Sequence, residues 1–266
     1  MGTATNERSE TPAELRRRIR AGRFSEPTAS LAPGYVQCNL LIRPARFAEA
    51  FADFCAANEA ACPVLARSAP GDPTLPALGA DLDIRSDLPR YRVFRDGEAT
   101  DEVTDIAALW RDDLVSFAFG CSFSFEEALA TEGVDLRYLD RGDREAVYLT
   151  DLDAVPAGRF KGKVVASMRP LRPADAIRAI TVTGTYPGVH GAPIHIGKPE
   201  MIGVDLDKPF DTIGRTRVLD DELPVFWACG LTPQMALAEA RLPHCITHAS
   251  AHMLITDLRL SDLARA

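Results

Sequence analysis

Several sequence motifs that mark common enzyme classes are missing from this chain of 266 residues. It contains no G-x-G-x-x-G, no Walker lysine motif and no G-x-S-x-G, so nothing in it indicates NAD, ATP or a serine hydrolase mechanism. Its apolar runs are too short to cross a bilayer, and the polar segment Met1–Glu10 lacks the apolar centre of a secretory signal. We therefore expect a cytoplasmic protein that is not bound to a membrane.

An excess of positive charge is also missing. The formal net charge at pH 7 is -8, whereas a surface that binds phosphate backbones needs clustered Lys and Arg. The sequence therefore argues against a nucleic-acid partner. It does not exclude a small anionic substrate, because a single pocket can be positive on an acidic protein.

The six cysteines lack the close spacing of a zinc ribbon. They stand at positions 38, 55, 62, 121, 229 and 245, and no two form a CxxC pair. In a chain of this length without a secretory signal, thiols are expected rather than three disulfides. We expect no organic cofactor, and a catalytic divalent metal stays open.

Helix and strand signals alternate along the chain, which predicts an α/β protein of the mixed α+β kind. Thr11-Pro-Ala-Glu14 forms a capping box, Pro44 is expected to open an amphipathic helix, and Ser68–Ser86 is expected to be a loop. Strands are expected at Tyr35–Ile42, Arg90–Arg95, Glu98–Thr104, Val164–Met168, Val225–Cys229 and Met253–Ile255. We expect a disordered tail at 1–10 and one globular unit at 11–266, with two intertwined or adjacent lobes and crossings near 68–110 and 150–165.

Two segments repeat one pattern and suggest an internal duplication. Phe119–Ala130 and Trp227–Ala238 each have an apolar run, a cysteine, a tight turn and a helix that ends in Ala-Leu-Ala. Ordinary strand–turn–helix units with common residues would look the same, so this alternative stays open. In a duplication, two helix N-termini would reach one cleft and bind the anionic groups of a dicarboxylate. The substrate-binding candidates on these turns are Ser122, Ser124, Gly230 and Thr232, with the two hydroxyls of Ser124 and Thr232 as helix caps.

All five histidines fall in the last third of the chain. His190 and His195 flank a turn that contains Gly191-Ala-Pro193, and such turns often carry catalytic groups. His248 and His252 are four residues apart, so on a helix they could share a metal ion, although the strand expected at Met253 disfavours that helix. We take His190, His195 and His248 as acid–base candidates and His252 as a substrate-binding candidate. The fifth, His244, is expected at the surface.

Four further side chains complete the set of candidates. Arg169 is expected at a strand end, where its guanidinium could bind a substrate carboxylate or form a structural ion pair. Cys121 and Cys229 precede expected helix N-termini, which favour a reactive thiolate, although buried inert thiols are common. Glu126 is expected in a first helical turn, as a catalytic carboxylate or as a simple helix stabiliser.

The order and spacing of several segments resemble the "putative hydro-lyase" family, also called the D-glutamate cyclase family, from about residue 13 to about residue 258. The segments that carry the resemblance are Gly22–Ser25, Leu31–Gln37, Asp87–Val93, Gly120–Glu126, Ser167–Pro170, Val189–Gly197, Pro224–Gly230 and Thr247–Asp257. The resemblance implies an enzyme of the lyase or cyclase kind in amino acid metabolism. The mammalian relatives linked to D-glutamate cyclisation carry a further C-terminal domain, which the resemblance does not include here.

These observations predict a lyase, of the hydro-lyase type or of the type that converts glutamate to 5-oxoproline. Its substrate would be a small amino- or hydroxy-dicarboxylate that loses or gains water, and the protein would form a homodimer or another homo-oligomer. Two alternatives stay open: a cysteine-dependent hydrolase of lactams or amides, and a non-catalytic protein that binds a small carboxylate.

Overall fold

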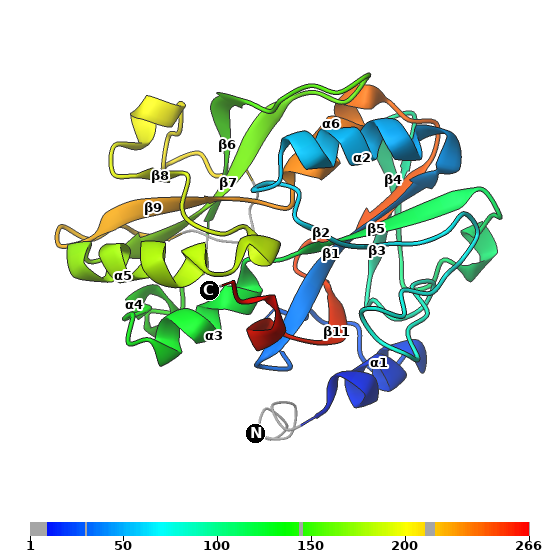
Figure 1. Cartoon of the computed structure of the whole chain (residues 1–266), viewed down its shortest axis with the longest axis horizontal. Helices are drawn as coiled ribbons and strands as arrows, with labels where there is room; N and C mark the ends of the chain where they lie inside the picture. Colours follow the sequence, from blue (N-terminus) through cyan, green and yellow to red (C-terminus); the bar gives the residue numbers. More distant parts are fainter. Residues whose placement is uncertain (1–9, 30, 144–145, 211–215, 266) are drawn as a thin grey trace.

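The computed structural model describes residues 10–29, 31–143, 146–210 and 216–265, so the expected tail at 1–10 lies outside the described residues except for Glu10. The fold is mixed α/β (Figure 1). The α-helices in these residues are α1 (Pro12–Arg20), α2 (Ala48–Ala57), α3 (Phe123–Thr131), α4 (Arg137–Asp140), α5 (Pro173–Gly184) and α6 (Thr232–Ala240). The strands are β1 (Tyr35–Pro44), β2 (Val64–Arg67), β3 (Tyr91–Arg95), β4 (Glu98–Val103), β5 (Leu114–Gly120), β6 (Ala146–Asp153), β7 (Lys163–Leu171), β8 (His195–Ile196), β9 (Leu223–Ala228), β10 (Cys245–His248) and β11 (Leu254–Arg259).

The strands form two antiparallel sheets. The larger sheet has the order β2-β5-β1-β10-β3-β4, with β11 also paired to β1, and the smaller sheet has the order β6-β7-β9-β8. Their central strands are buried along nearly their whole length, because both faces of each sheet carry apolar side chains under helices. The two sheets occupy the two sides of the molecule in Figure 1.

The element order contains the same unit twice. The first unit is β1-α2-β2-β5-α3-β6 and the second is β7-α5-β8-β9-α6-β10, with the β3–β4 hairpin inserted into the first. Each unit builds a three-stranded core in the same order, β2-β5-β1 or β8-β9-β7. The last strand of each unit then crosses over, because β6 pairs with β7 and β10 pairs with β1. The chain is therefore an interwoven duplication.

The two units also share a pattern of hydrogen bonds between their first strand and the turn that begins their second helix. The amide of Cys121 donates to the carbonyl oxygen of Gln37, and the amide of Gln37 donates to the hydroxyl of Ser124. In the second unit, the amide of Cys229 donates to the carbonyl oxygen of Val165, whose own amide donates to the hydroxyl of Thr232. Both hydroxyls lie inside their helices, and the N-caps are Ser122 and Leu231. Ser124 and Thr232 are therefore not the helix caps that the sequence predicts; they attach each helix to a neighbouring strand.

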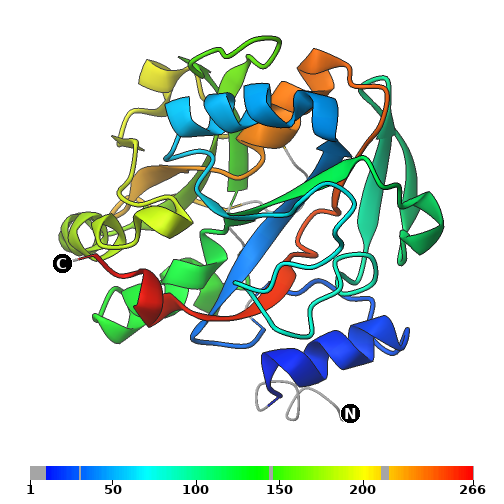
Figure 2. The same ribbon diagram turned by 45° about the vertical axis from the view of Figure 1, so that its right-hand side comes forward.

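Helices of opposite units pack together, which encloses the two halves in common cores. Phe51 and Phe54 of α2 lie in one apolar cluster with Leu237 of α6, and Phe125 of α3 lies in another with Ala179 of α5. Both helix pairs lie side by side in the two views of the molecule (Figure 1, Figure 2). Neither unit can bury its helices without the other.

Most of the expected local structure is present. The capping box at Thr11 and Glu14 begins α1, and the expected hairpin is β3–β4. The helix expected from Pro44 begins later, because Pro44 is still extended and a short 3-10 turn at Ala45–Phe47 precedes α2. His244 was expected at the surface but is only 8% exposed, because the chain turns inward there to enter the buried strand β10.

Candidate functional site

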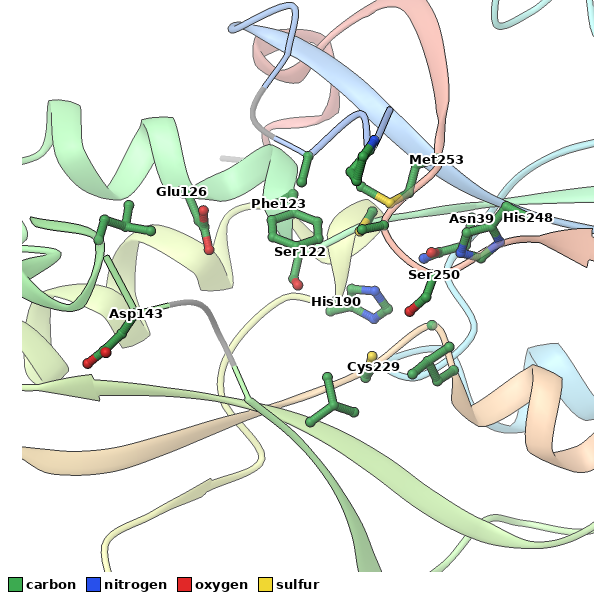
Figure 3. Close-up of a pocket in the computed structure, with 18 of the residues that line it drawn as sticks. Asn39, Ser122, Phe123, Glu126, Asp143, His190, Cys229, His248, Ser250 and Met253 are labelled. Atoms are coloured by element: carbon green, nitrogen blue, oxygen red, sulfur yellow. The ribbon is translucent and has the colours of Figure 1, made fainter. Parts of the chain in front are cut away.

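A cavity of about 490 Å³ lies where the two units meet. Figure 3 shows His190 in the middle of the labelled side chains, with Glu126 and Asp143 toward one end and Asn39 and His248 toward the other. Its lining includes seven of the residues expected in the site, namely Cys121, Ser122, Glu126, His190, Cys229, Gly230 and His248. This size suits a small organic molecule.

The first turns of α3 and α6 both reach this cavity. Ser122 and Phe123 line it from α3, and Gly230 and Leu231 line it from the turn into α6. Several amides at these helix starts already have acceptors, because those of Ser124, Phe125 and Thr232 donate to the backbone of the preceding turn, and Pro233 has no N–H. The helix dipoles still favour negative charge nearby. The two helix starts share one cleft, as the repeated pattern predicts.

His190 is held in an unfavourable backbone conformation. Its φ is 81°, in the left-handed region that non-glycine residues avoid. The preceding turn packs directly on Gly120, where a Cβ atom would stand 1.9 Å from the carbonyl oxygen of Gly188. Only glycine at position 120 lets the turn before His190 pack this closely, and this packing places the imidazole in the cavity. Such local strain is typical of functional sites.

The His190 side chain is an uncharged imidazole with a defined tautomer. Its Nδ1 lies 2.8 Å from the carbonyl oxygen of Ala60, which can only accept, so Nδ1 carries the proton and Nε2 has the lone pair. Burial, opposed by backbone hydrogen bonds with Ala60 and Gly120 and assisted by the nearby Arg169 charge, lowers the pKa of His190 to about 4. His190 is therefore a neutral base candidate at pH 7.

His248 is the second buried imidazole of the cavity. Both backbone groups of Leu40 reach its Nδ1, the amide at 3.2 Å and the carbonyl oxygen at 3.3 Å, and the Gln234 amide group lies 3.4 Å from the same atom. These contacts fit either neutral tautomer of His248. Burial lowers the pKa of His248 to about 4. The cavity therefore contains two imidazoles that are uncharged at pH 7.

Glu126 lies in the cavity wall and forms an ion pair with the buried side chain of Arg169. Arg169 donates to its Oε1 from Nε and Nη2, at 2.9 and 2.7 Å, and the hydroxyl of Tyr138 donates to the same oxygen over 2.8 Å. Arg169 also donates to the hydroxyl of Ser122. The donors to Glu126 within the described residues all reach Oε1, which leaves Oε2 for a group in the cavity.

The structure places Arg169 behind the cavity. Its side chain is fully buried, and it is not among the residues that line the cavity. The sequence left two roles open for Arg169, and the observed contacts are those of a structural ion pair. The guanidinium binds Glu126, which lines the cavity in front of it. A direct bond from Arg169 to a ligand carboxylate stays a prediction.

Four other candidates lie outside the lining, namely His195, His252, Ser124 and Thr232. His195, on β8, bonds through Nε2 to the carbonyl oxygen of Lys198, and His252 bonds through Nδ1 to that of Ser250. The hydroxyls of Ser124 and Thr232 bond to β1 and β7. Within the described part of the chain, no three His, Cys, Asp or Glu side chains come together as a metal site.

Cys121 and Cys229 both line the cavity, one from each unit. All six cysteines of the chain are present as thiols, as expected. Sequence reasoning missed Asn39, Asp143 and Ser250, which also line the cavity. No short-range pattern in the sequence marks these three residues. Asn39 lies here because β1 passes close to Gly230, where a Cβ atom would stand 2.1 Å from the Asn39 amide nitrogen.

No helix in the described residues is long and apolar enough to cross a membrane.

Comparison with known proteins gives a consistent result. Residues 115–257 match the model of a family described as D-glutamate cyclase. A protein named "putative hydro-lyase" from Afipia carboxidovorans is 54% identical over 95% of this chain and 93% of its own length. One of the same name from Bordetella petrii is 53% identical over 96% and 97%, and one from Rhodopseudomonas palustris is 54% identical over 94% and 92%. A nitrogen repressor-like protein from Methanococcus jannaschii aligns with a TM-score of only 0.42 and 13% identity, over 96% of this chain and 97% of its own, which bears on neither fold nor function.

Proposed function

Since the chain belongs to the D-glutamate cyclase family, whose members include the named hydro-lyases, we propose that its cavity catalyses the loss or gain of water by a small amino-dicarboxylate. The family supports a lyase or cyclase kind of function. The pair of substrates to test first is glutamate and 5-oxoproline. Hydroxy-dicarboxylates are the second group.

One acceptor in the cavity wall suits an amino acid. Glu126 and Asp143 lie toward one end (Figure 3), and both carboxylates already have arginine partners, Arg169 for Glu126 and Arg141 and Arg217 for Asp143. The donors described above reach Oε1 of Glu126, so we place the ammonium group of the substrate on Oε2. A hydroxy-dicarboxylate has no cation for this oxygen, so we expect it to bind more weakly.

In ring closure, the amine attacks the distal carboxyl carbon. The reaction breaks two N–H bonds and one C–O bond, forms one C–N bond, and puts both protons on the departing oxygen. His190 accepts each proton from nitrogen at Nε2 and passes it to that oxygen. His248 donates a hydrogen bond from Nε2–H to the same oxygen while charge develops on it. An anionic substrate beside His190 would raise its pKa toward the range that proton transfer needs.

The observation that carries the proposal is the pair of buried, uncharged histidines in one cavity reached by two helix N-termini. The proposed mechanism uses the His248 tautomer that has its proton on Nε2 and accepts from the Leu40 amide at Nδ1. The test is to incubate the protein with D- and L-glutamate, 5-oxoproline, aspartate and malate, and to follow products by NMR. The mixtures are run with EDTA and with added Mg²⁺ or Zn²⁺, because metal dependence is open.

Variants then separate the roles. His190→Gln and His248→Gln should each lower kcat by roughly 10²- to 10⁴-fold, the usual contribution of a positioned proton-transfer group. His195→Gln is the matched control, since His195 lies outside the cavity and should leave kcat unchanged. Full activity in both cavity variants, or no turnover of any compound, would contradict the proposal.

One observation favours a second candidate function, since two thiols line the cavity. A cysteine-dependent lactam hydrolase would form a covalent acyl-enzyme on one sulfur during turnover. Mass spectrometry of protein quenched during reaction distinguishes the two, because the histidine mechanism forms no adduct. A protein that binds without catalysis would keep its affinity in both histidine variants.

A further inference from the structure

The two thiols in the cavity are equivalent positions of the duplication. Cys121 directly follows β5 and Cys229 directly follows β9, which are the central strands of the two three-stranded cores, and each cysteine precedes the first turn of a helix. Their amides donate to equivalent carbonyl oxygens, Cys121 to Gln37 over 3.0 Å and Cys229 to Val165 over 2.9 Å. Both line one cavity of about 490 Å³. The two units also pair reciprocally, since β6 pairs with β7 and β10 pairs with β1, so the thiols are equivalent groups that reach one cavity from different units.

We propose that these equivalent thiols face a bound amino acid from opposite sides, and that Cys121 and Cys229 exchange its Cα proton and so interconvert its D and L forms. This activity rests on the same ligand site as the proposed function. It is a different reaction, because closure of glutamate to 5-oxoproline leaves the Cα–H bond intact.

The reaction balances without any added reagent. One sulfur, as a thiolate, removes the Cα proton; the C–H bond breaks, an S–H bond forms, and the electron pair is delocalised into the α-carboxylate. The other thiol then gives its proton to the opposite face of Cα, so its S–H bond breaks and a new C–H bond forms. After each turnover the proton lies on the sulfur across the site, and the reverse reaction restores it.

The surroundings suit this chemistry. Removal of a Cα proton places extra negative charge on the α-carboxylate, and the dipoles of α3 and α6, which begin beside the two cysteines, favour such charge. Arg169 fixes Glu126 from behind, and in the proposal Oε2 of Glu126 binds the ammonium group.

The test uses the intact protein in D₂O with each proteinogenic amino acid as separate D and L enantiomers, and with 5-oxoproline. Proton NMR measures the loss of the Cα–H signal, and chiral chromatography measures inversion. We expect deuterium at Cα in at least one compound, and deuterated product of the opposite configuration. If no compound in the panel exchanges, the inference is wrong, whether or not water is lost. Exchange without any loss of water would instead overturn the proposed function alone.

Single variants test the pair. Cys121→Ser and Cys229→Ser should each lower inversion by on the order of 100-fold or more. Each should keep slow exchange of one enantiomer, a different one in each variant, because the remaining thiol still faces one side. Cys55→Ala is the control, since Cys55 is buried in α2 away from the cavity. Equal exchange of both enantiomers in the two variants and in the control would overturn the assignment. Exchange by the unaltered protein decides the question even if a variant does not fold.

Discussion

At the scale of single residues, the site depends on two imidazoles that are buried without charge. Burial lowers the pKa of His190 and of His248 from 6.5 to about 4. Between these values the unfolded chain binds more protons than the folded chain, so the free energy of unfolding falls as pH falls. The stability from each uncharged histidine is complete above about pH 6.5 and is lost as pH approaches 4.

We predict that the free energy of unfolding falls as pH is lowered across this range. Each histidine adds at most about 1.4 kcal/mol per pH unit to that slope. Urea unfolding at pH 7, 5.5 and 4.5 measures it. His190→Gln should show a shallower pH dependence than the unaltered protein, and His195→Gln should not. An identical pH dependence in all three proteins would mean that the pKa of His190 in the folded protein is close to its value in the unfolded chain.

Arg169 gives a second prediction at this scale. Its guanidinium is fully buried against Glu126, and removal of one partner of a buried ion pair leaves the other charge without compensation. Arg169→Ala should therefore lower the free energy of unfolding by roughly 3–5 kcal/mol. From the sequence alone, we would expect this change to affect substrate binding and not stability.

The control for this prediction is Arg172→Ala. Arg172 forms exposed ion pairs with Asp135 and Asp221, and exposed pairs contribute only about 0–1 kcal/mol. Thermal or urea unfolding compares the two variants. If Arg169→Ala is as stable as Arg172→Ala and only KM for substrate rises, the guanidinium binds substrate directly.

At the scale of elements, the approach of β5 to the turn before His190 depends on one glycine. A Cβ atom at Gly120 would stand 1.9 Å from the carbonyl oxygen of Gly188 and 2.8 Å from a methyl group of Val189. Gly120→Ala must push that turn away and move His190 with it. We predict that the free energy of unfolding falls by about 1–3 kcal/mol, which is typical of overpacking, and that turnover is lost.

Gly184→Ala is the matched control, because the nearest atom to a Cβ there is 3.9 Å away and Gly184 ends α5. It should keep full stability and activity, as measured by urea unfolding and by the NMR assay. A Gly120→Ala protein with unchanged stability and turnover would show that the turn does not have to pack so closely.

Local elements could be predicted from the sequence where short-range signals determine them. The capping box, the Asp96-Gly97 hairpin and the buried strands β7 and β9 follow from caps, turn residues and apolar runs. Ser124 and Thr232 were misjudged as caps because a hydroxyl near a helix start can bond to the helix or to a strand distant in sequence. Short-range patterns do not distinguish these two outcomes.

At the scale of the whole molecule, the repeated Cys and Ala-Leu-Ala pattern indicated that two helix starts share a cleft, and both line the cavity. The pairing of β10 with β1 could not be predicted, because strand pairing over about two hundred residues leaves no local signal. The pairing of β6 with β7 joins consecutive strands and shows an exchange only once the unit boundary between them is known. A second repeat, Arg43-Pro-Ala-Arg46 and Arg169-Pro-Leu-Arg172, becomes visible only once β1 and β7 are known to be equivalent. Asn39 likewise lines the cavity only because β1 passes beside Gly230.

The exchanged strands give a prediction about the whole chain. The segment between β6 and β7 is exposed at Gly158 and Arg159, so a cut there gives one chain with the first unit and one with the second. Each piece alone lacks the strand that borders its central sheet, and its helices α2 or α5 lack the partners α6 or α3. We predict that neither piece folds alone, because an open sheet edge and an uncovered apolar face favour aggregation.

The two pieces made together should copurify one to one, show the circular dichroism of the intact chain, and keep the turnover that requires residues of both. A single piece that is soluble, monomeric and cooperatively folded would mean that the crossing strands add to a core that each unit already possesses.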